Sequence, residues 1–300
     1  MKDLQAQLTN LMDVKDHKAV FNEIRTITSL IFPQFDFTPF NRTYKSIVSL
    51  FHGKYPGYRK SNVDYHDFGH TLSVTLAVAR LMHGAVEAGY SLTEKDLNMG
   101  LISGLMHDTG YIQQKDDSEG TGAKYTLIHI DRSINFLEQH YRNDPMFRND
   151  LDSFREILKC TGLNTNISEI RFTNKTVELL GKTLGTADLL GQMADRHYVE
   201  KLLYLYYEFV EGGITTFTNQ LDLLEKTQGF YQMNRKRFSE ELGDVYRFAR
   251  YHFRKRWGID EDLYLKSIEN NLEYLDYVIT HHRHDYQNHL RRLVPHKIPK

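Results

Sequence analysis

The chain has 300 residues, with 38 Lys and Arg against 39 Asp and Glu, so its formal net charge is -1. This balance excludes the strongly basic surface that would attract nucleic acid or an anionic membrane. The single cysteine, Cys160, excludes an internal disulfide. No signal-like apolar run follows the N-terminus, and no uncharged apolar stretch is long enough to span a bilayer, so we expect a cytoplasmic protein.

Apolar residues recur at helical spacing along most of the chain, as at Leu97, Leu101 and Leu105, and alternating strand-like runs are rare. We therefore predict an all-α protein. The pattern predicts helices over residues 17–31, 41–51, 68–88, 94–107, 125–140, 150–160, 173–192, 196–211, 217–229, 234–256 and 261–280.

No linker or repeat divides the chain, which favours one multi-helix domain over residues 60–282. The helices of residues 1–59 are expected to pack on it. Residues 283–300 form a His-rich basic tail that we expect to bind metal only non-specifically. The turn-rich segment 113–126 contains "GTGAK" but lacks the other parts of a phosphate-binding loop, so it predicts a mobile loop beside a site.

Three segments carry candidate functional residues. In "VDYHDFGHTLSV", His66 and His70 lie four residues apart at the start of a predicted helix and share one face. Taken alone, these histidines fit a metal site, a catalytic base or a helix core equally well.

The second segment, "GLISGLMHDTGY", places His107 and Asp108 at the end of an apolar helix. Adjacent helical residues point about 100° apart, so the two side chains converge on one ion only where the helix ends. The third segment, "LGTADLLGQMADRHY", surrounds Asp188 with apolar residues, which indicates a helix cap, a buried ion pair or a metal ligand.

Together, His70, His107, Asp108 and Asp188 supply two imidazoles and two carboxylates. This set suits a divalent cation such as Mn, Fe, Zn, Ni or Mg. Because such an ion would keep positions open for water, the set favours hydrolysis over a purely structural role.

The order H…HD…D resembles the signature of the HD-domain metal-dependent phosphohydrolases, and the local segments are most similar to the catalytic domain of class I cyclic nucleotide phosphodiesterases. "YHDFGHTLSV" resembles that family's Y-H-N-x-x-H-x-x-D-V, "LMHDTGY" its H-D-x-x-H, "SINFLEQHY" its S-V-L-E-N-H-H and "GTADLL" its H-x-A-D-L. "LYLYYEFVEGG" and residues 241–279 resemble later segments of the same domain, so the resemblance covers about residues 60 to 280 in order.

The resemblance implies an all-α HD/phosphodiesterase-like domain in which His70, His107, Asp108 and Asp188 bind a first metal and Asp108 also reaches a second. It implies that His66 is the general acid that protonates the leaving oxygen. It assigns to Glu138 a contact with the site water or the histidine network.

This chain departs from the family pattern at several positions. Tyr111 stands where the family has a second histidine, and Asp67 stands where it has asparagine, so we expect one tight ion and a second, weaker one held by Asp108 and water. Glu240 and Glu241 stand where a base-reading glutamine is expected, and Asp244 replaces an aromatic clamp. A carboxylate only accepts hydrogen bonds, so Glu241 would favour guanine over adenine if it contacted a base; the alternative is that both glutamates are solvated surface residues.

The expected function is that of a metal-dependent phosphohydrolase, a phosphodiesterase acting on a nucleotide or a related small phosphate ester. No nucleic acid or membrane partner is expected. Two alternatives remain open: a nucleotide phosphomonoesterase, and a metal-binding regulatory helical module without turnover.

Overall fold

The computed structural model describes residues 7–292, and this part of the chain forms twelve α-helices and no β-strand, which confirms the expected all-α class. The helices are α1 (Leu8–Leu11), α2 (His17–Ile31), α3 (Thr38–Phe51), α4 (Phe68–Glu87), α5 (Glu94–Met106), α6 (His129–Tyr141), α7 (Leu151–Lys159), α8 (Lys175–Met193), α9 (Tyr198–Glu211), α10 (Gln220–Glu240), α11 (Phe248–Trp257) and α12 (Leu263–His282). Short 3-10 turns join several of them, including one over Thr109–Tyr111.

Most of the predicted helices are present, but the division of residues 217–256 was wrong. We expected a break after residue 229, whereas α10 runs unbroken from Gln220 to Glu240. The chain turns instead at Gly243 and Asp244, whose φ angles are 63° and 59°. These angles lie in the left-handed region, which ends a helix. The short helix α1 was not predicted.

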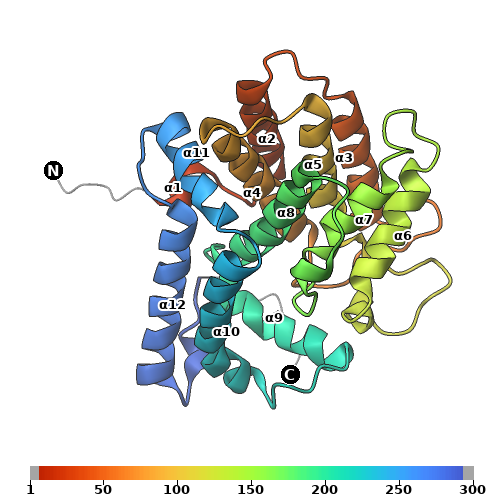
Figure 1. Cartoon of the computed structure of the whole chain (residues 1–300). Helices are drawn as coiled ribbons and strands as arrows, with labels where there is room; N and C mark the ends of the chain where they lie inside the picture. The colour runs from red at the N-terminus through yellow and green to blue at the C-terminus, as the bar shows by residue number, and fades with distance from the viewer. Residues whose placement is uncertain (1–6, 293–300) are drawn as a thin grey trace.

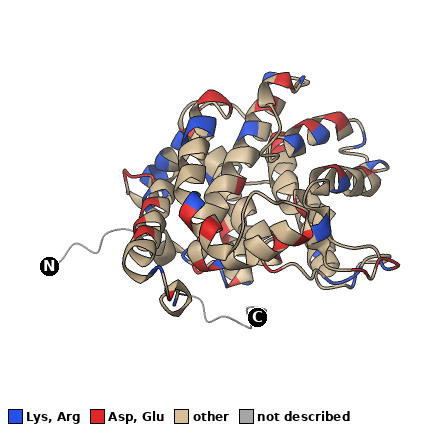
Figure 2. Ribbon diagram, turned by 90° about the horizontal axis from the view of Figure 1, so that it is seen from below, with Lys and Arg blue, Asp and Glu red and all other residues tan. Residues whose placement is uncertain are grey.

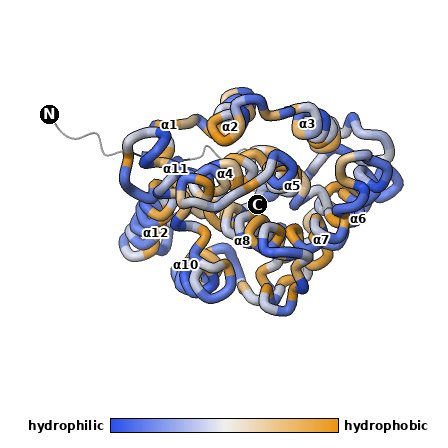
Figure 3. The backbone as a smooth tube through the Cα atoms, turned by 45° about the horizontal axis from the view of Figure 1, so that its top comes forward, coloured by the Kyte–Doolittle hydropathy of each residue, from blue (hydrophilic) through white to orange (hydrophobic). Residues whose placement is uncertain are grey.

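Helix α4 forms the centre of the molecule (Figure 1). It packs against α2, α5, α8 and α11, and α8 in turn contacts α5, α7 and α12. The N-terminal helices α2 and α3 lie against α4 and α5 respectively. Orange apolar segments mark α4 and α8 in the interior, whereas the outer helices show more polar stretches (Figure 3). The two helices that carry His70 and Asp188 are therefore neighbours in the core.

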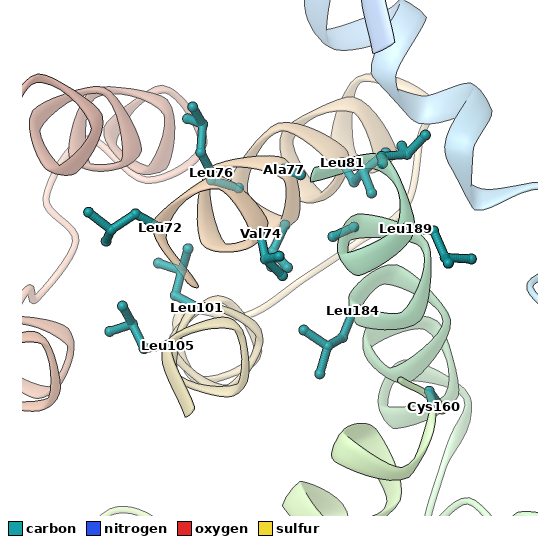
Figure 4. Packing of buried hydrophobic residues seen from close by; sticks show 14 of the residues in the cluster. Leu72, Val74, Leu76, Ala77, Leu81, Leu101, Leu105, Cys160, Leu184 and Leu189 are labelled. Atoms are coloured by element: carbon teal, nitrogen blue, oxygen red, sulfur yellow. The ribbon is translucent and has the colours of Figure 1, made fainter. Parts of the chain in front are cut away.

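Close packing fixes the relative positions of α4, α5 and α8. Apolar side chains of all three helices fill the space between them, among them the buried side chains of Val74, Leu101 and Leu184 (Figure 4). Interiors packed in this way contain few voids and are hard to compress. The ends of these helices that carry His70, His107 and Asp188 are thus held by the surrounding core.

Gly84 permits the close approach of α11 to α4. A Cβ atom at Gly84 would lie 1.9 Å from the carbonyl oxygen of Phe248, at the first residue of α11. No side chain fits at that distance. Glycine at this position is therefore a requirement of the packing.

The surface carries acidic and basic residues in alternation, with no face of a single sign in the view of Figure 2. Among the described residues, none of the helices combines the length and apolar character needed to cross a bilayer. Residues 293–300 of the expected tail lie outside the described part of the chain.

Candidate metal centre

The four side chains expected to bind metal lie together in the core. His70 sits in the first turn of α4, His107 directly follows α5, Asp108 begins the next turn, and Asp188 lies on α8. The Nε2 atoms of His70 and His107 are 3.3 Å apart. Asp108 Oδ2 lies 3.3 Å from His70 Nε2 and 3.1 Å from His107 Nε2. Asp188 Oδ1 lies 3.2 Å from His70 Nε2 and 3.7 Å from His107 Nε2.

The distances among His70, His107 and Asp108 suit ligands of one ion. Metal–ligand bonds of about 2.1 Å place neighbouring ligand atoms about 3.0 to 3.5 Å apart in octahedral or tetrahedral geometry. His70, His107 and Asp108 offer ligand atoms that all lie within 4.8 Å of one another. Asp188 is outside this group, but its Oδ1 lies near the Nε2 atoms of both histidines. Asp108 Oδ2 is buried and has no well-directed hydrogen bond, which a cation would compensate.

Local structure orients the two imidazoles. The Nδ1 of His107 lies 2.9 Å from the carbonyl oxygen of Gly104, to which it donates, and this leaves the Nε2 lone pair directed at the cluster. The backbone N–H of His70 donates to Asp67 Oδ1 at 2.7 Å, which caps α4. Asp67, one of the departures from the family pattern, therefore has a structural role at the start of this helix.

The electrostatics of the cluster favour a cation. Burial alone would lower the pKa of His70, but the carboxylates of Asp108 and Asp188 outweigh it and raise this pKa to about 10. Burial opposes ionisation of Asp108, yet His107 and His70 hold the pKa of that carboxyl well below its usual range. The site thus stabilises positive charge beside the Asp108 carboxylate.

The turn after Asp108 is fixed against α6. The N–H of Gly110 donates to Ser133 Oγ at 2.8 Å, and Ser133 Oγ donates to the carbonyl oxygen of His107 at 2.6 Å. A Cβ atom at Gly110 would lie 1.9 Å from the carbonyl oxygen of His129. Gly110 is therefore required for α6 to approach the His107–Asp108 turn, and not only to end a helix.

His66 lies beside the cluster and is held by a glutamate that the sequence analysis did not assign. Its Nδ1 lies 2.6 Å from Glu208 Oε2 on α9, and Glu208 Oε1 accepts the backbone N–H of Tyr65 at 2.6 Å. The ring centroids of His66 and His70 are 5.9 Å apart. A carboxylate on Nδ1 fixes the ring and leaves Nε2 free for proton transfer. The only sequence signal was the "EFVEGG" segment, to which the resemblance gave no role.

His129, at the start of α6, also reaches the cluster and was missed. Its Nε2 lies 3.8 Å from Asp108 Oδ1, and its Nδ1 donates to the carbonyl oxygen of Thr126 at 2.7 Å. Tyr111 stacks between His66 and His129, with centroid distances of 4.3 and 4.5 Å. We expected that a second ion would have only Asp108 and water, but the fold brings an imidazole to the second oxygen of Asp108 from a different helix.

Comparison with known proteins places all of these residues inside one matched region. The model of the Npun_R2479-like family matches residues 37–242, which is more than half of the chain. The chain belongs to the Npun_R2479-like family. No curated protein matches it. The match assigns the chain to this family but names no activity, so the chemistry of the site follows from its side chains.

Not every expected site residue joins the cluster in this Npun_R2479-like protein. The carboxylate of Glu138, on α6, forms an ion pair with Arg155 on α7, and no contact between Glu138 and the cluster is present in the described chain. Glu208, and not Glu138, forms the contact with the histidine beside the cluster, His66. Resemblance of a short motif did not locate this carboxylate because its partner lies 142 residues away.

Glu240 and Glu241 lie at the C-terminal end of α10 and pair with residues one turn earlier. Glu240 lies 3.7 Å from Lys236, and Glu241 lies 3.9 Å from Arg237. The Arg237 guanidinium is buried and donates to the carbonyl oxygens of residues 162 and 163. These contacts favour the surface interpretation of the two glutamates, and the base preference stays a prediction.

The loop of residues 113–126 lies beside the centre in this family member. A Cβ atom at Gly122 would lie 1.8 Å from the carbonyl oxygen of Tyr111. Side-chain contacts tie the loop down: Asp117 pairs with Lys124 at 2.5 Å and accepts the hydroxyl of Tyr125. The loop was expected to be a mobile loop beside a site; it lies next to the candidate centre through Tyr111, and its mobility stays a prediction.

A second group of possible ligands lies at the end of α12. Ligand atoms of His282, Asp285 and His289 all lie within 4.8 Å of one another, and His289 Nε2 is 3.0 Å from Asp285 Oδ2. These residues are partly or fully exposed. The tail was expected to bind metal only non-specifically, and this group identifies which of its residues a stray ion would contact.

Proposed function

We propose that this protein is a metal-dependent phosphohydrolase that acts on a small phosphate ester. The observation that carries the proposal is the convergence of two imidazoles and two carboxylates from three helical segments, with a carboxylate-oriented histidine beside them. A purely structural metal site needs no such histidine. A hydrolase uses one to protonate its leaving group.

Access to the cluster supports turnover. The side chains of His70, His107 and Asp108 are at most 4% exposed, whereas Asp188 and His66 are each 15% exposed and His129 is 19% exposed. The cluster therefore has a deeply buried side and a side that reaches solvent. Substrate and water would approach from the side of His66 and His129.

The residues divide the chemistry between them. A divalent cation held by His70, His107, Asp108 and Asp188 would supply Lewis acidity, which activates water and neutralises phosphoryl charge. His66 would give its proton to the departing oxygen, and Glu208 would keep the ring oriented and stabilise its cationic form. Tyr111 stacks on His66 and excludes water from one face of the ring.

Within this class, a phosphodiester of a nucleotide or a related compound is the preferred substrate because of the resemblance to the cyclic nucleotide phosphodiesterases. A nucleotide phosphomonoester is the alternative, since the same ligand set hydrolyses either ester. The competing interpretation is a regulatory metal module without turnover, and the deep burial of one side of the cluster favours it.

The test is hydrolysis of bis(p-nitrophenyl) phosphate and p-nitrophenyl phosphate by protein loaded separately with Mn, Fe, Zn, Ni or Mg. Preference for the diester supports the phosphodiesterase, and preference for the monoester supports the phosphatase. Asp188→Ala should abolish the activity of either kind. A protein that binds metal tightly through the cluster but turns over neither ester would contradict the proposal and favour the regulatory module.

A further inference from the structure

A separate cavity of about 420 Å³ lies between the N-terminal segment, α4, the end of α8 and α12. Its wall includes apolar side chains such as Leu8, Met12 and Leu76, and the phenol ring of Tyr264. Its size lies within the range of about 300 to 1,000 Å³ that is usual for small-molecule sites. Nothing in the proposed hydrolysis uses this space.

Arg80 lines this cavity from α4 and carries its charge on a buried side chain. It is only 2% exposed, and in the described chain it forms no ion pair. One terminal nitrogen, Nη1, donates to the hydroxyl of Tyr264 at 3.1 Å, while Nε and Nη2 are buried without a hydrogen-bond partner. An arginine stays charged in proteins, so an uncompensated buried guanidinium is costly.

Among the described residues, no carboxylate forms an ion pair with this guanidinium. The guanidinium lies over the rings of Phe253 and Tyr264, at 5.5 and 5.6 Å from their centroids, which is a weak form of compensation. Asp262 Oδ1, at the start of α12, accepts the backbone N–H groups of residues 264 and 265. On the α11 side the neighbouring group is His252, whose pKa burial and the charge of Arg80 lower to about 2.

Further cations surround the cavity. Lys15, Arg196 and Arg292 line it together with Arg80, and among the described residues none of the four forms an ion pair. Two carboxylates also line it. Asp13, Lys15 and Arg196 are exposed, and Asp195 is already paired with Lys201 at 2.8 Å. The excess of positive charge over an apolar wall matches a ligand with an anionic head and an organic body.

The cavity is distinct from the metal centre although the same two helices build both. On α4 the lining residues Ser73, Leu76 and Arg80 form one stripe. At 100° per residue this stripe is turned by roughly 90° from His70. On α8 the lining begins at Gly191, which packs against Val74 of α4.

We propose that this cavity is a second ligand site, which binds a small phosphate-bearing organic molecule with its phosphate toward Arg80. Phosphate is favoured over carboxylate because four cations from four parts of the chain line the cavity, and a dianion compensates more of their charge than a monoanion does. The organic part of the ligand contacts Met12, Leu76 and Tyr264. The ligand sits across α4 and α8, whose positions also set the metal ligands.

The test is calorimetric titration of the full-length protein in excess chelator, so that no metal can bind phosphate. The probes are phenyl phosphate, inorganic phosphate and benzoate. We expect phenyl phosphate to bind more tightly than inorganic phosphate or benzoate. Binding of inorganic phosphate alone would identify a free phosphate site and overturn the organic ligand, and no heat from any probe up to roughly 10 mM would overturn the site altogether.

Variants locate the binding. Arg80→Met should lower the affinity for phenyl phosphate at least tenfold and raise the melting temperature of the ligand-free protein, because it removes an uncompensated buried charge. If that variant does not fold, Arg196→Gln combined with Arg292→Gln should weaken binding in the same way. Arg148→Gln removes an exposed cation that does not line the cavity, and should bind normally.

One further variant separates this site from the metal centre. Asp188→Ala should bind phenyl phosphate as tightly as the wild type in chelator. Equal loss of binding in Asp188→Ala, or full binding in Arg80→Met, would overturn the second site. Neither result depends on whether the protein hydrolyses an ester.

Discussion

The imidazole of His66 and the carboxylate of Glu208 approach to 2.6 Å across 142 residues of sequence. This pair joins the segment before α4 to α9, beside the four clustered side chains of the candidate metal centre. It resembles the carboxylate–histidine arrangement by which enzymes fix a ring and one of its tautomers. Its consequences are measurable apart from metal binding.

His66→Ala should retain its metal and lose on the order of 10² to 10⁴ in kcat, the range expected for a positioned general acid. Glu208→Gln should give a smaller loss and shift the pH profile of kcat, because the amide orients the ring without stabilising its charge. Metal content by elemental analysis accompanies the kinetics. Loss of metal from His66→Ala would show that His66 is a ligand.

Asp108→Ala and Asp188→Ala should each lose metal and hydrolysis together. Each substitution removes an anionic ligand, and neither imidazole can supply the missing charge. Glu138→Ala is the matched control, since its carboxylate pairs with Arg155. We expect normal metal content in that variant. Near-normal metal in both aspartate variants would contradict the assignment of the cluster.

A second, weaker ion should depend on His129. His129 Nε2 lies 3.8 Å from the oxygen of Asp108 that does not face His70, so His129→Ala should remove the weaker ion and leave the tight one. The control is His282→Ala, because His282, Asp285 and His289 offer ligands elsewhere. Calorimetric titration with Mn or Zn of both variants decides where the second ion sits, and two equally tight ions would contradict the predicted order.

Gly84→Ala should lower the free energy of unfolding by about 1 to 3 kcal/mol, since its Cβ would meet the carbonyl oxygen of Phe248 at 1.9 Å. Gly229→Ala is the matched control. It lies inside α10 with nothing within 4 Å of an added Cβ, so it should stabilise the protein by up to about 1 kcal/mol. Urea unfolding of both variants measures the difference, and equal effects would rule out the contact between α4 and α11 as the cause.

Acid should destabilise the protein through His252. This histidine is fully buried, and burial lowers its pKa from 6.5 to about 2. Below pH 6.5 the unfolded chain gains a proton there that the folded chain does not, so stability is lost as the pH falls. His252→Leu should therefore reduce the slope of unfolding free energy against pH by about 1 kcal/mol per unit between roughly pH 6 and 4.5.

The slope of unfolding free energy against pH is compared between the wild type and the variant, because Asp262 changes stability with pH in the direction opposite to His252. Burial raises the pKa of Asp262 to about 6, so this carboxyl gains a proton in the folded state first and adds stability as the pH falls through that value. His281→Leu, at an exposed position, is the control and should leave the slope unchanged. An unchanged slope in His252→Leu would show that this imidazole is solvated.

Helical periodicity determined the fold class and most helix positions, because the spacing of apolar residues follows from which face of each helix is buried. The same local reasoning misplaced the break within residues 217–256. Gly229 is tolerated inside α10, and the chain instead reverses at Gly243 and Asp244. From the sequence alone, a glycine that ends a helix looks the same as one that lies inside a helix.

The sequence alone also determined which four residues lie in the candidate centre, because His70, His107, Asp108 and Asp188 stand in short segments whose residue types suggest ligands. Only the tertiary structure decided their partners. Glu208 was marked only by the resemblance of its segment, and no local pattern marks His129 or Arg80. Their roles come from which helices pack together, and that is set by burial of apolar faces over the whole chain.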